Sequence, residues 1–265
     1  MNDAVLDNPA ARLDFWLRMG RPEADMIREM RHGRRGHDGR SYQIRETWAK
    51  IWHLDIEDPD ELVTLHENGM TLIKEARQVR QVVSESPSPF AAHALAHFDQ
   101  IEECVAHFVR MESATMDQMF NPVEQGGWHS LPLLSTLLRE EAPEIVPPDE
   151  TREDLIAQTH GLVQNVLADE DLDAATKTQI VDALLKVQDS LVRFKIGGAP
   201  VVEEASDRLA GSLVRSVLLR GREALDHPTT RAVFVLLGAI SAAFGIPADY
   251  LAISAGFAGE IGPGE

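Results

Sequence analysis

Side chains that could bind a metal ion recur at helical spacing along one stretch of the chain. They are His93, His97, Cys104 and His107. On a continuous helix, residues three or four apart share a face, so each neighbouring pair could turn its ligand atoms toward one Zn²⁺ or similar ion. His97 and Cys104 are two turns apart, about 10 Å along the axis, so one ion cannot use all four. Because no H-E-x-x-H or E-x-x-H pattern accompanies them, we favour ordinary boundary histidines over a metal site or a pH-sensitive interface, and we expect no cofactor.

A second candidate is a basic segment in a chain that is otherwise acidic. Arg31, Arg34, Arg35 and Arg40 are interspersed there with glycine, and guanidinium groups pair bidentately with phosphate and carboxylate. The glycine spacing and the lysine of a phosphate-binding loop are missing. We favour a solvated loop that pairs with the protein's own acids. The alternative is a site for a small anionic ligand such as a nucleotide, or for an acidic partner.

Paired catalytic carboxylates are not indicated. The acid pairs Glu102-Glu103, Glu140-Glu141 and Glu203-Glu204 are adjacent in sequence, which points the two side chains of each pair in different directions on a helix. No nucleophile stands in a recognisable motif. We therefore expect a protein that is not an enzyme.

The longest apolar stretch runs from Arg231 to Gly259 and has Ser241 as the only polar side chain between Arg231 and Asp249. Its small residues have the spacing used for close helix approach. Gly245, Pro247 and Asp249 interrupt the run at about 15 to 17 residues, fewer than the roughly 20 that span a bilayer. We favour a helical hairpin buried in the protein or in an oligomer, with membrane insertion and docking on a partner as alternatives. The candidate interface or membrane residues are Phe234, Leu237, Gly238, Ala242, Gly245 and Leu251.

Composition narrows the class of protein. The chain has 265 residues, 44% of them hydrophobic and 26% charged, which predicts a folded globular protein. A net charge of −18 makes broad binding to nucleic acid unfavourable. The single cysteine excludes an internal disulfide, and the polar start shows no secretion signal. We expect a bacterial cytoplasmic protein that associates with membranes, if at all, through its C-terminal segment.

Apolar residues recur at spacings of three and four, which predicts an all-α protein built as a multi-helix bundle. Asn8 and Asp58, each followed by proline, are predicted helix caps. Gly20 is expected to end the first helix, and Gly211 lies inside a helix, where a close backbone contact would explain it. Helices are predicted at about 9–20, 22–33, 41–53, 58–83, 90–119, 131–139, 152–167, 174–196, 200–221 and 228–245.

Proline and acid between residues 143 and 150 indicate a linker. The predicted domains are an N-terminal helical region at 1–142, a helical module at 151–225 and the apolar hairpin at 226–265. The hairpin is expected to pack on the module or in an oligomer interface.

The segments Asp171-Leu172-Asp173, Phe194-Lys195-Ile196-Gly197-Gly198 and Leu209-Ala210-Gly211-Ser212-Leu213 lie in a region, about 150–259, that resembles uncharacterised bacterial helical proteins. In those proteins a helix pair ends in a glycine turn and an apolar C-terminal segment follows. The resemblance implies this architecture and no functional residue.

The expected function is that of a non-enzymatic interaction or regulatory protein that forms a homo-oligomer or binds a protein partner. One alternative is a bacterial membrane-acting effector whose C-terminal segment inserts or oligomerises on a signal. A second alternative is a metal-dependent helical-bundle enzyme built on His93 and His97.

Overall fold

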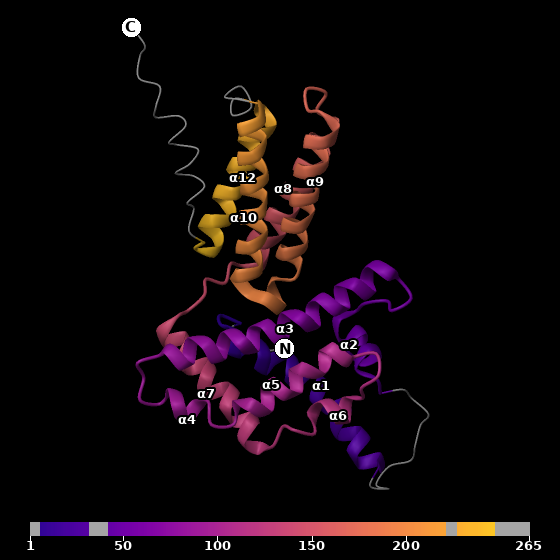
Figure 1. Ribbon diagram of the computed structural model, residues 1–265, viewed down its shortest axis with the longest axis vertical. Helices are drawn as coiled ribbons and strands as arrows, with labels where there is room; N and C mark the ends of the chain where they lie inside the picture. The colour runs from indigo at the N-terminus through magenta and orange to yellow at the C-terminus, as the bar shows by residue number, and fades with distance from the viewer. Residues whose placement is uncertain (1–5, 32–41, 221–226, 247–265) are drawn as a thin grey trace. The chain divides into compact units, whose positions relative to one another are not determined.

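The computed structural model describes residues 6–31, 42–220 and 227–246 (Figure 1). These residues form helices joined by turns, and there is no β-strand among them. The predicted all-α, multi-helix class is therefore confirmed. The second helix of the predicted hairpin lies outside the described residues.

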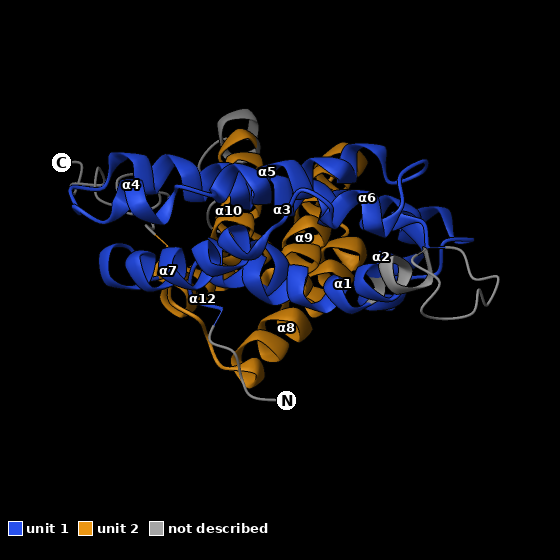
Figure 2. Ribbon diagram, turned by 90° about the horizontal axis from the view of Figure 1, so that it is seen from below, with its two compact units in different colours: residues 1–143, 195–197 blue, residues 144–194, 198–265 orange. Residues whose placement is uncertain are grey.

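The chain divides into two compact units (Figure 2). Unit 1 contains residues 1–143 together with the short segment 195–197, and unit 2 contains 144–194 and 198–265. Each unit has its own apolar core.

Unit 1 is organised around α1 (Pro9–Arg31), which packs against α3 (Pro59–Glu85), α6 (Met116–Phe120) and α7 (Gln125–Glu141). Its core includes the fully buried side chains of Trp48, Phe98 and Phe108. The remaining elements of this unit are α2 (Ile44–Trp52), α4 (Ala91–Ala94), α5 (Phe98–Ala106) and the 3₁₀ helix η1 (His107–Arg110).

Two predicted helix starts are confirmed by their caps. The side chain of Asn8 accepts a hydrogen bond from the Ala11 N–H at 2.9 Å. Asp58 accepts from the N–H groups of Asp60 and Glu61 at the start of α3, with Pro59 in its first turn. These caps were predictable because every partner lies within three residues of the capping side chain.

The predicted helix end at Gly20 is wrong, because α1 runs without a break to Arg31 and includes Pro22. Gly20 instead provides space for a neighbour. A Cβ atom at this position would lie 2.9 Å from Cζ2 of Trp48, so the glycine permits α1 to approach this buried ring.

The predicted continuous helix at 90–119 is also wrong. The chain is divided there into α4, α5, η1 and α6. His97 leaves helical geometry, with φ −125° and ψ 14°, and its ring packs over Gly126, where a Cβ would lie 2.7 Å from its Cδ2. This tertiary contact accompanies the break between α4 and α5.

Unit 2 contains four helices in the described part of the chain: α8 (Asp149–Ala168), α9 (Ala174–Val192), α10 (Phe194–Arg220) and α12 (Pro228–Phe244). Helix α8 packs against both α9 and α12. Their shared core includes Leu155, Leu184, Leu209 and Leu237. Helix α10 is kinked at Gly198, whose φ of 61° and ψ of −158° suit glycine and few other residues.

The apolar stretch forms α12, which begins at Pro228 and ends where Gly245 adopts a left-handed φ of 66°. The N-cap residue of α12 is His227. Of the helices that the structure describes, none combines the length and apolar character needed to cross a membrane.

Candidate functional site

The four predicted metal ligands of unit 1 lie in different environments. His93 is an exposed residue of α4, and His97 is turned against Gly126. Nδ1 of His107 lies 3.0 Å from the carbonyl oxygen of Glu103. Cys104 is buried in the core, where burial and then the charge of Glu103 raise the pKa of its thiol. In the described part of the chain, none of the four belongs to a group of three metal-ligating side chains within reach of one another.

The predicted arginine site lies mostly outside the described residues. Arg31 is the last residue of α1, and Arg34, Arg35 and Arg40 follow it in the segment that is not described.

The candidate interface residues of the apolar stretch differ in exposure. Leu237 is fully buried in the core of unit 2, whereas Phe234 and Gly238 are half-buried. Ala242 and Gly245 are exposed, and Leu251 lies outside the described residues. Helix α12 thus places one face in the core of its own unit and leaves another face at the surface.

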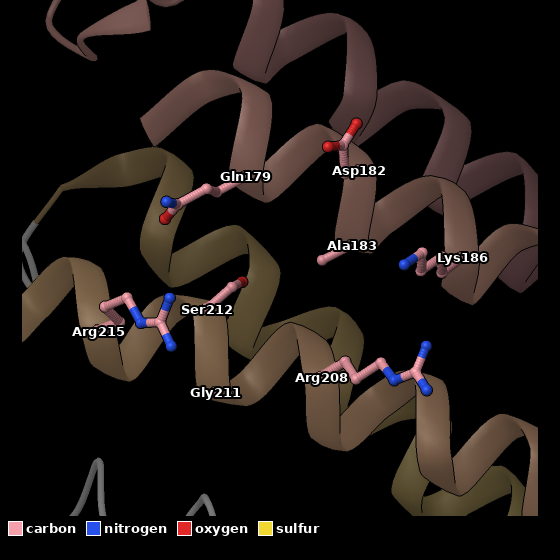
Figure 3. Close-up of a pocket in the computed structure, with 8 residues that line it drawn as sticks. All are labelled: Gln179, Asp182, Ala183, Lys186, Arg208, Gly211, Ser212 and Arg215. Carbon is pink, nitrogen blue, oxygen red and sulfur yellow. The ribbon is translucent and has the colours of Figure 1, made fainter. Parts of the chain in front are cut away.

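An open groove of about 400 Å³ lies between α9 and α10. We call it the α9–α10 groove. In Figure 3, Gln179 and Arg215 stand at one end and Lys186 and Arg208 at the other. Helix α9 contributes Gln179, Asp182, Ala183 and Lys186, and α10 contributes Arg208, Gly211, Ser212 and Arg215.

The middle of the groove is made of small residues. Ala183 and Ser212 lie there, together with Gly211. Apart from its chain neighbours and the adjacent backbone of α10, no described atom lies within 4 Å of the position that a Cβ of Gly211 would take, so the predicted close backbone contact is wrong. The absent side chain instead leaves the groove open.

The cations of the groove are paired to different degrees. Arg208 forms an ion pair with Glu204, one turn away on α10. Among the residues that the structure describes, Lys186 and Arg215 form no hydrogen bond or ion pair. Both are exposed in a chain of net charge −18, so they are available to an anionic group from outside.

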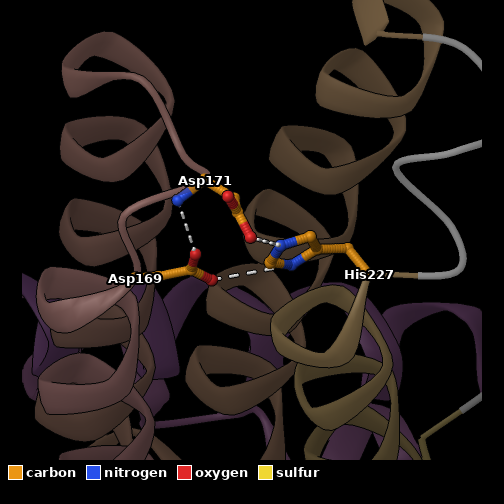
Figure 4. Close-up of side chains that lie close together, drawn as sticks. All are labelled: Asp169, Asp171 and His227. Atoms are coloured by element: carbon orange, nitrogen blue, oxygen red, sulfur yellow. Dashed lines mark hydrogen bonds and ion pairs between the residues drawn. The ribbon is translucent and has the colours of Figure 1, made fainter.

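A second constellation joins the end of α8 to the start of α12 (Figure 4). Nδ1 of His227 lies 3.5 Å from an Oδ of Asp169, and Nε2 lies 3.9 Å from an Oδ of Asp171. We call these three residues the Asp–Asp–His cluster. Asp169 and His227 are 11% and 20% exposed, whereas Asp171 is 88% exposed.

Asp169 is held as a carboxylate by its surroundings. Burial alone would raise its pKa, but the remaining interactions outweigh this effect and lower it. They are a hydrogen bond donated by the Thr229 hydroxyl, one donated by the Asp171 N–H, and the charges of His227 and Lys177. The cluster therefore has one firmly ionised oxygen ligand beside an imidazole.

Sequence reasoning missed both features. The spacing of Asp169, Asp171 and Asp173 in the turn after α8 is a signal for an oxygen-rich site, but His227 is about sixty residues away and has no local motif. The groove is invisible in sequence because its cations come from two different helices. The one local signal of the groove was Gly211, a glycine in the middle of a helix that packing does not require.

No protein-family model, curated protein or solved structure matches this chain.

Proposed function

We propose that this chain is a non-enzymatic interaction protein that binds an acidic segment of a protein partner in the α9–α10 groove. The observation that carries the proposal is a pair of cations, Lys186 and Arg215, at opposite ends of a hollow of about 400 Å³. Neither cation has an ion-pair partner among the residues that the structure describes. Complementary charge of this kind steers encounter and selects partners.

Charge distribution supports an acidic occupant. The chain has 43 Asp and Glu against 25 Lys and Arg, so an exposed cation has many acids available to it. Lys186 and Arg215 nevertheless have no ion pair in the described structure. A partner carboxylate would give both cations a counter-ion, and a nucleic acid would be repelled by most of the remaining surface.

The spacing of the cations favours a peptide segment over a small anion. Arg208 and Arg215 are seven residues apart on α10, which corresponds to about 10 Å along the helix axis. Two separate carboxylates can each face one of these arginines at this spacing, whereas a single anion would require both side chains to bend toward it. Two acidic side chains two turns apart on a partner helix would match this separation.

The small residues in the α9–α10 groove leave room for a partner segment to approach the backbone of α10. Glycine within a helix is less favourable than alanine by about 1 kcal/mol. Packing within unit 2 does not require Gly211, because no described atom beyond its chain neighbours and the adjacent backbone of α10 lies within 4 Å of the position of its missing Cβ. We infer that the glycine makes space for a partner segment, and Gly211→Phe should obstruct it.

The test is fluorescence anisotropy on the full chain with a labelled helical peptide that carries glutamates seven residues apart. We expect saturable binding that weakens with added salt and is lost when glutamine replaces glutamate. Lys186→Glu and Arg215→Glu should each weaken binding about tenfold, the equivalent of about 1.4 kcal/mol. Arg77→Glu, which reverses an exposed charge on α3 of unit 1, is the matched control and should leave binding unchanged.

Equal binding of both peptides, or of wild type and the two groove variants, would refute the proposal. Sedimentation of the chain alone tests whether a second copy of the chain occupies the groove. If the chain self-associates and both groove variants abolish this, a second copy occupies the groove and the partner assignment is wrong.

A further inference from the structure

Independently of the groove, we propose that the Asp–Asp–His cluster is a binding site for a divalent transition-metal ion such as Zn²⁺. The ligand atoms of Asp169, Asp171 and His227 all lie within 4.8 Å of one another. They come from two parts of unit 2. Asp169 and Asp171 lie at the end of α8 and in the turn that follows, and His227 is the N-cap residue of α12.

The separations suit coordination after small side-chain movements. Zinc binds imidazole nitrogen and carboxylate oxygen at about 2.0–2.2 Å, so two tetrahedral ligands lie about 3.4 Å apart. Nδ1 of His227 and the nearest Oδ of Asp169 are 3.5 Å apart. Asp171 is 88% exposed, so its carboxylate can rotate toward the ion, and water can complete the coordination from the same open side.

The histidine supplies an independent indication of a ligand. Its Nδ1 is shielded from solvent and has no hydrogen-bond partner in the described structure. The Asp169 oxygen 3.5 Å away is within ion-pair distance but forms no hydrogen bond with it. Buried nitrogen atoms are rarely left in this state, because losing water without gaining a partner is unfavourable. An ion between Nδ1 and Asp169 would satisfy this nitrogen.

The nitrogen ligand defines the class of ion. Ca²⁺ and Mg²⁺ prefer oxygen ligands alone, whereas imidazole suits zinc and its neighbours in the first transition row. Two carboxylates and a neutral imidazole carry a charge of −2, which a divalent cation neutralises. The chemistry of the donors therefore favours a transition metal over calcium.

Neighbouring groups hold the ligands in position, as is usual around metal sites. The Thr229 hydroxyl donates to Oδ2 of Asp169, and the Asp171 N–H donates to Oδ1 at 3.1 Å. The His227 carbonyl accepts from the Arg231 N–H at 3.1 Å, and Pro228 follows directly. Both the carboxylate and the backbone that carries the imidazole are thus oriented before an ion binds.

The test is calorimetric titration of the full chain, prepared without a histidine tag and treated with chelator, using Zn²⁺ alone. We expect one ion per chain. His227→Ala and Asp171→Asn should each weaken binding by at least about the tenfold that loss of an outer-shell group costs. His160→Ala and Asp154→Asn, exposed residues of α8, are the matched controls and should bind as wild type does.

Thermal unfolding gives a second readout. Zn²⁺ should raise the Tm of the wild type and of both controls, because an ion that binds only the folded state stabilises it. At the same Zn²⁺ concentration, the rise in Tm should be smaller in the two site variants. If His227→Ala fails to fold, Asp171→Asn still decides, since its side chain is almost fully exposed. Absence of stoichiometric zinc, or unchanged zinc binding in both site variants, would overturn the proposal.

Discussion

The guanidinium of Arg12 lies 2.7 Å from the carboxylate of Glu75, and both side chains are buried in the interior of unit 1. Nε of Arg12 also donates to Oε2 of Glu75, and its Nη1 donates to the carbonyl of Leu6. Because the two residues lie on α1 and α3, the pair fixes how these helices meet. The attraction between the two charges offsets part of the cost of burying them.

Glu75→Gln should lower the free energy of unfolding by about 3–5 kcal/mol, because it removes the carboxylate charge that lies 2.7 Å from the buried Arg12 guanidinium. Urea denaturation followed by tryptophan fluorescence measures this. Asp25→Asn, which removes the exposed pair between Arg21 and Asp25 on α1, should change stability by less than about 1 kcal/mol. Similar losses in the two variants would show that burial of the pair is not what makes it important.

Gly20→Ala should destabilise unit 1 by about 1–3 kcal/mol, because its Cβ would lie 2.9 Å from the buried Trp48 ring and the core would have to shift. The matched control is Gly161→Ala in the middle of α8, where no atom lies within 4 Å of the new Cβ. There the better helix propensity of alanine should raise stability by up to about 1 kcal/mol. A gain in stability from Gly20→Ala would mean that the ring moves freely.

Cys104 should be unreactive toward thiol reagents at pH 8 in the folded protein and reactive once urea unfolds it. Burial raises its pKa, so the folded thiol stays protonated. Above about pH 8.5 the unfolded thiol ionises while the folded one does not, so this residue should lower stability by about 1.4 kcal/mol per pH unit there. Cys104→Ala should remove this contribution from the pH dependence, and an unchanged slope would contradict it.

Features set by neighbouring residues were predictable from the sequence. Asn8 and Asp58 cap helices whose first turns they contact, and the turn at Gly245 needs only the residues around it. Gly20 and His97 were misread because their conformations depend on partners far along the chain, Trp48 and Gly126 respectively. In the sequence alone, a glycine that makes space for an aromatic ring far along the chain cannot be distinguished from a glycine that ends a helix.

The candidate sites were harder to predict than the fold for the same reason. Histidines at helical spacing indicate one face only if the helix is continuous, and the break at His97 removes that condition. The Asp–Asp–His cluster requires the start of α12 to lie beside the end of α8, which no periodicity reveals. The apolar stretch could be recognised from the sequence because the length of an apolar run is a local property. The structure shows in addition that Leu237 lies in the core of unit 2.

Gly238 inside α12 and Gly245 directly after it should respond in opposite directions to substitution by alanine. Gly245 has a left-handed φ of 66°, which is unfavourable for alanine by about 1–2 kcal/mol. Its Cβ would also lie 2.5 Å from Cδ1 of Ile145, whose side chain would have to move. Gly238 is helical and has no atom within 4 Å of a new Cβ, so alanine there should stabilise the helix by up to about 1 kcal/mol.

Hydrogen exchange of the α12 amides distinguishes these effects from global unfolding, because it reports local opening of the helix. Gly245→Ala should accelerate exchange at the C-terminal end of α12, and Gly238→Ala should slow it along the middle of the helix. The exchange of α3 amides in unit 1 should be unchanged in both variants. If both substitutions slowed exchange in α12, the left-handed turn at Gly245 would not be what ends the helix, and the helix would continue beyond Phe244.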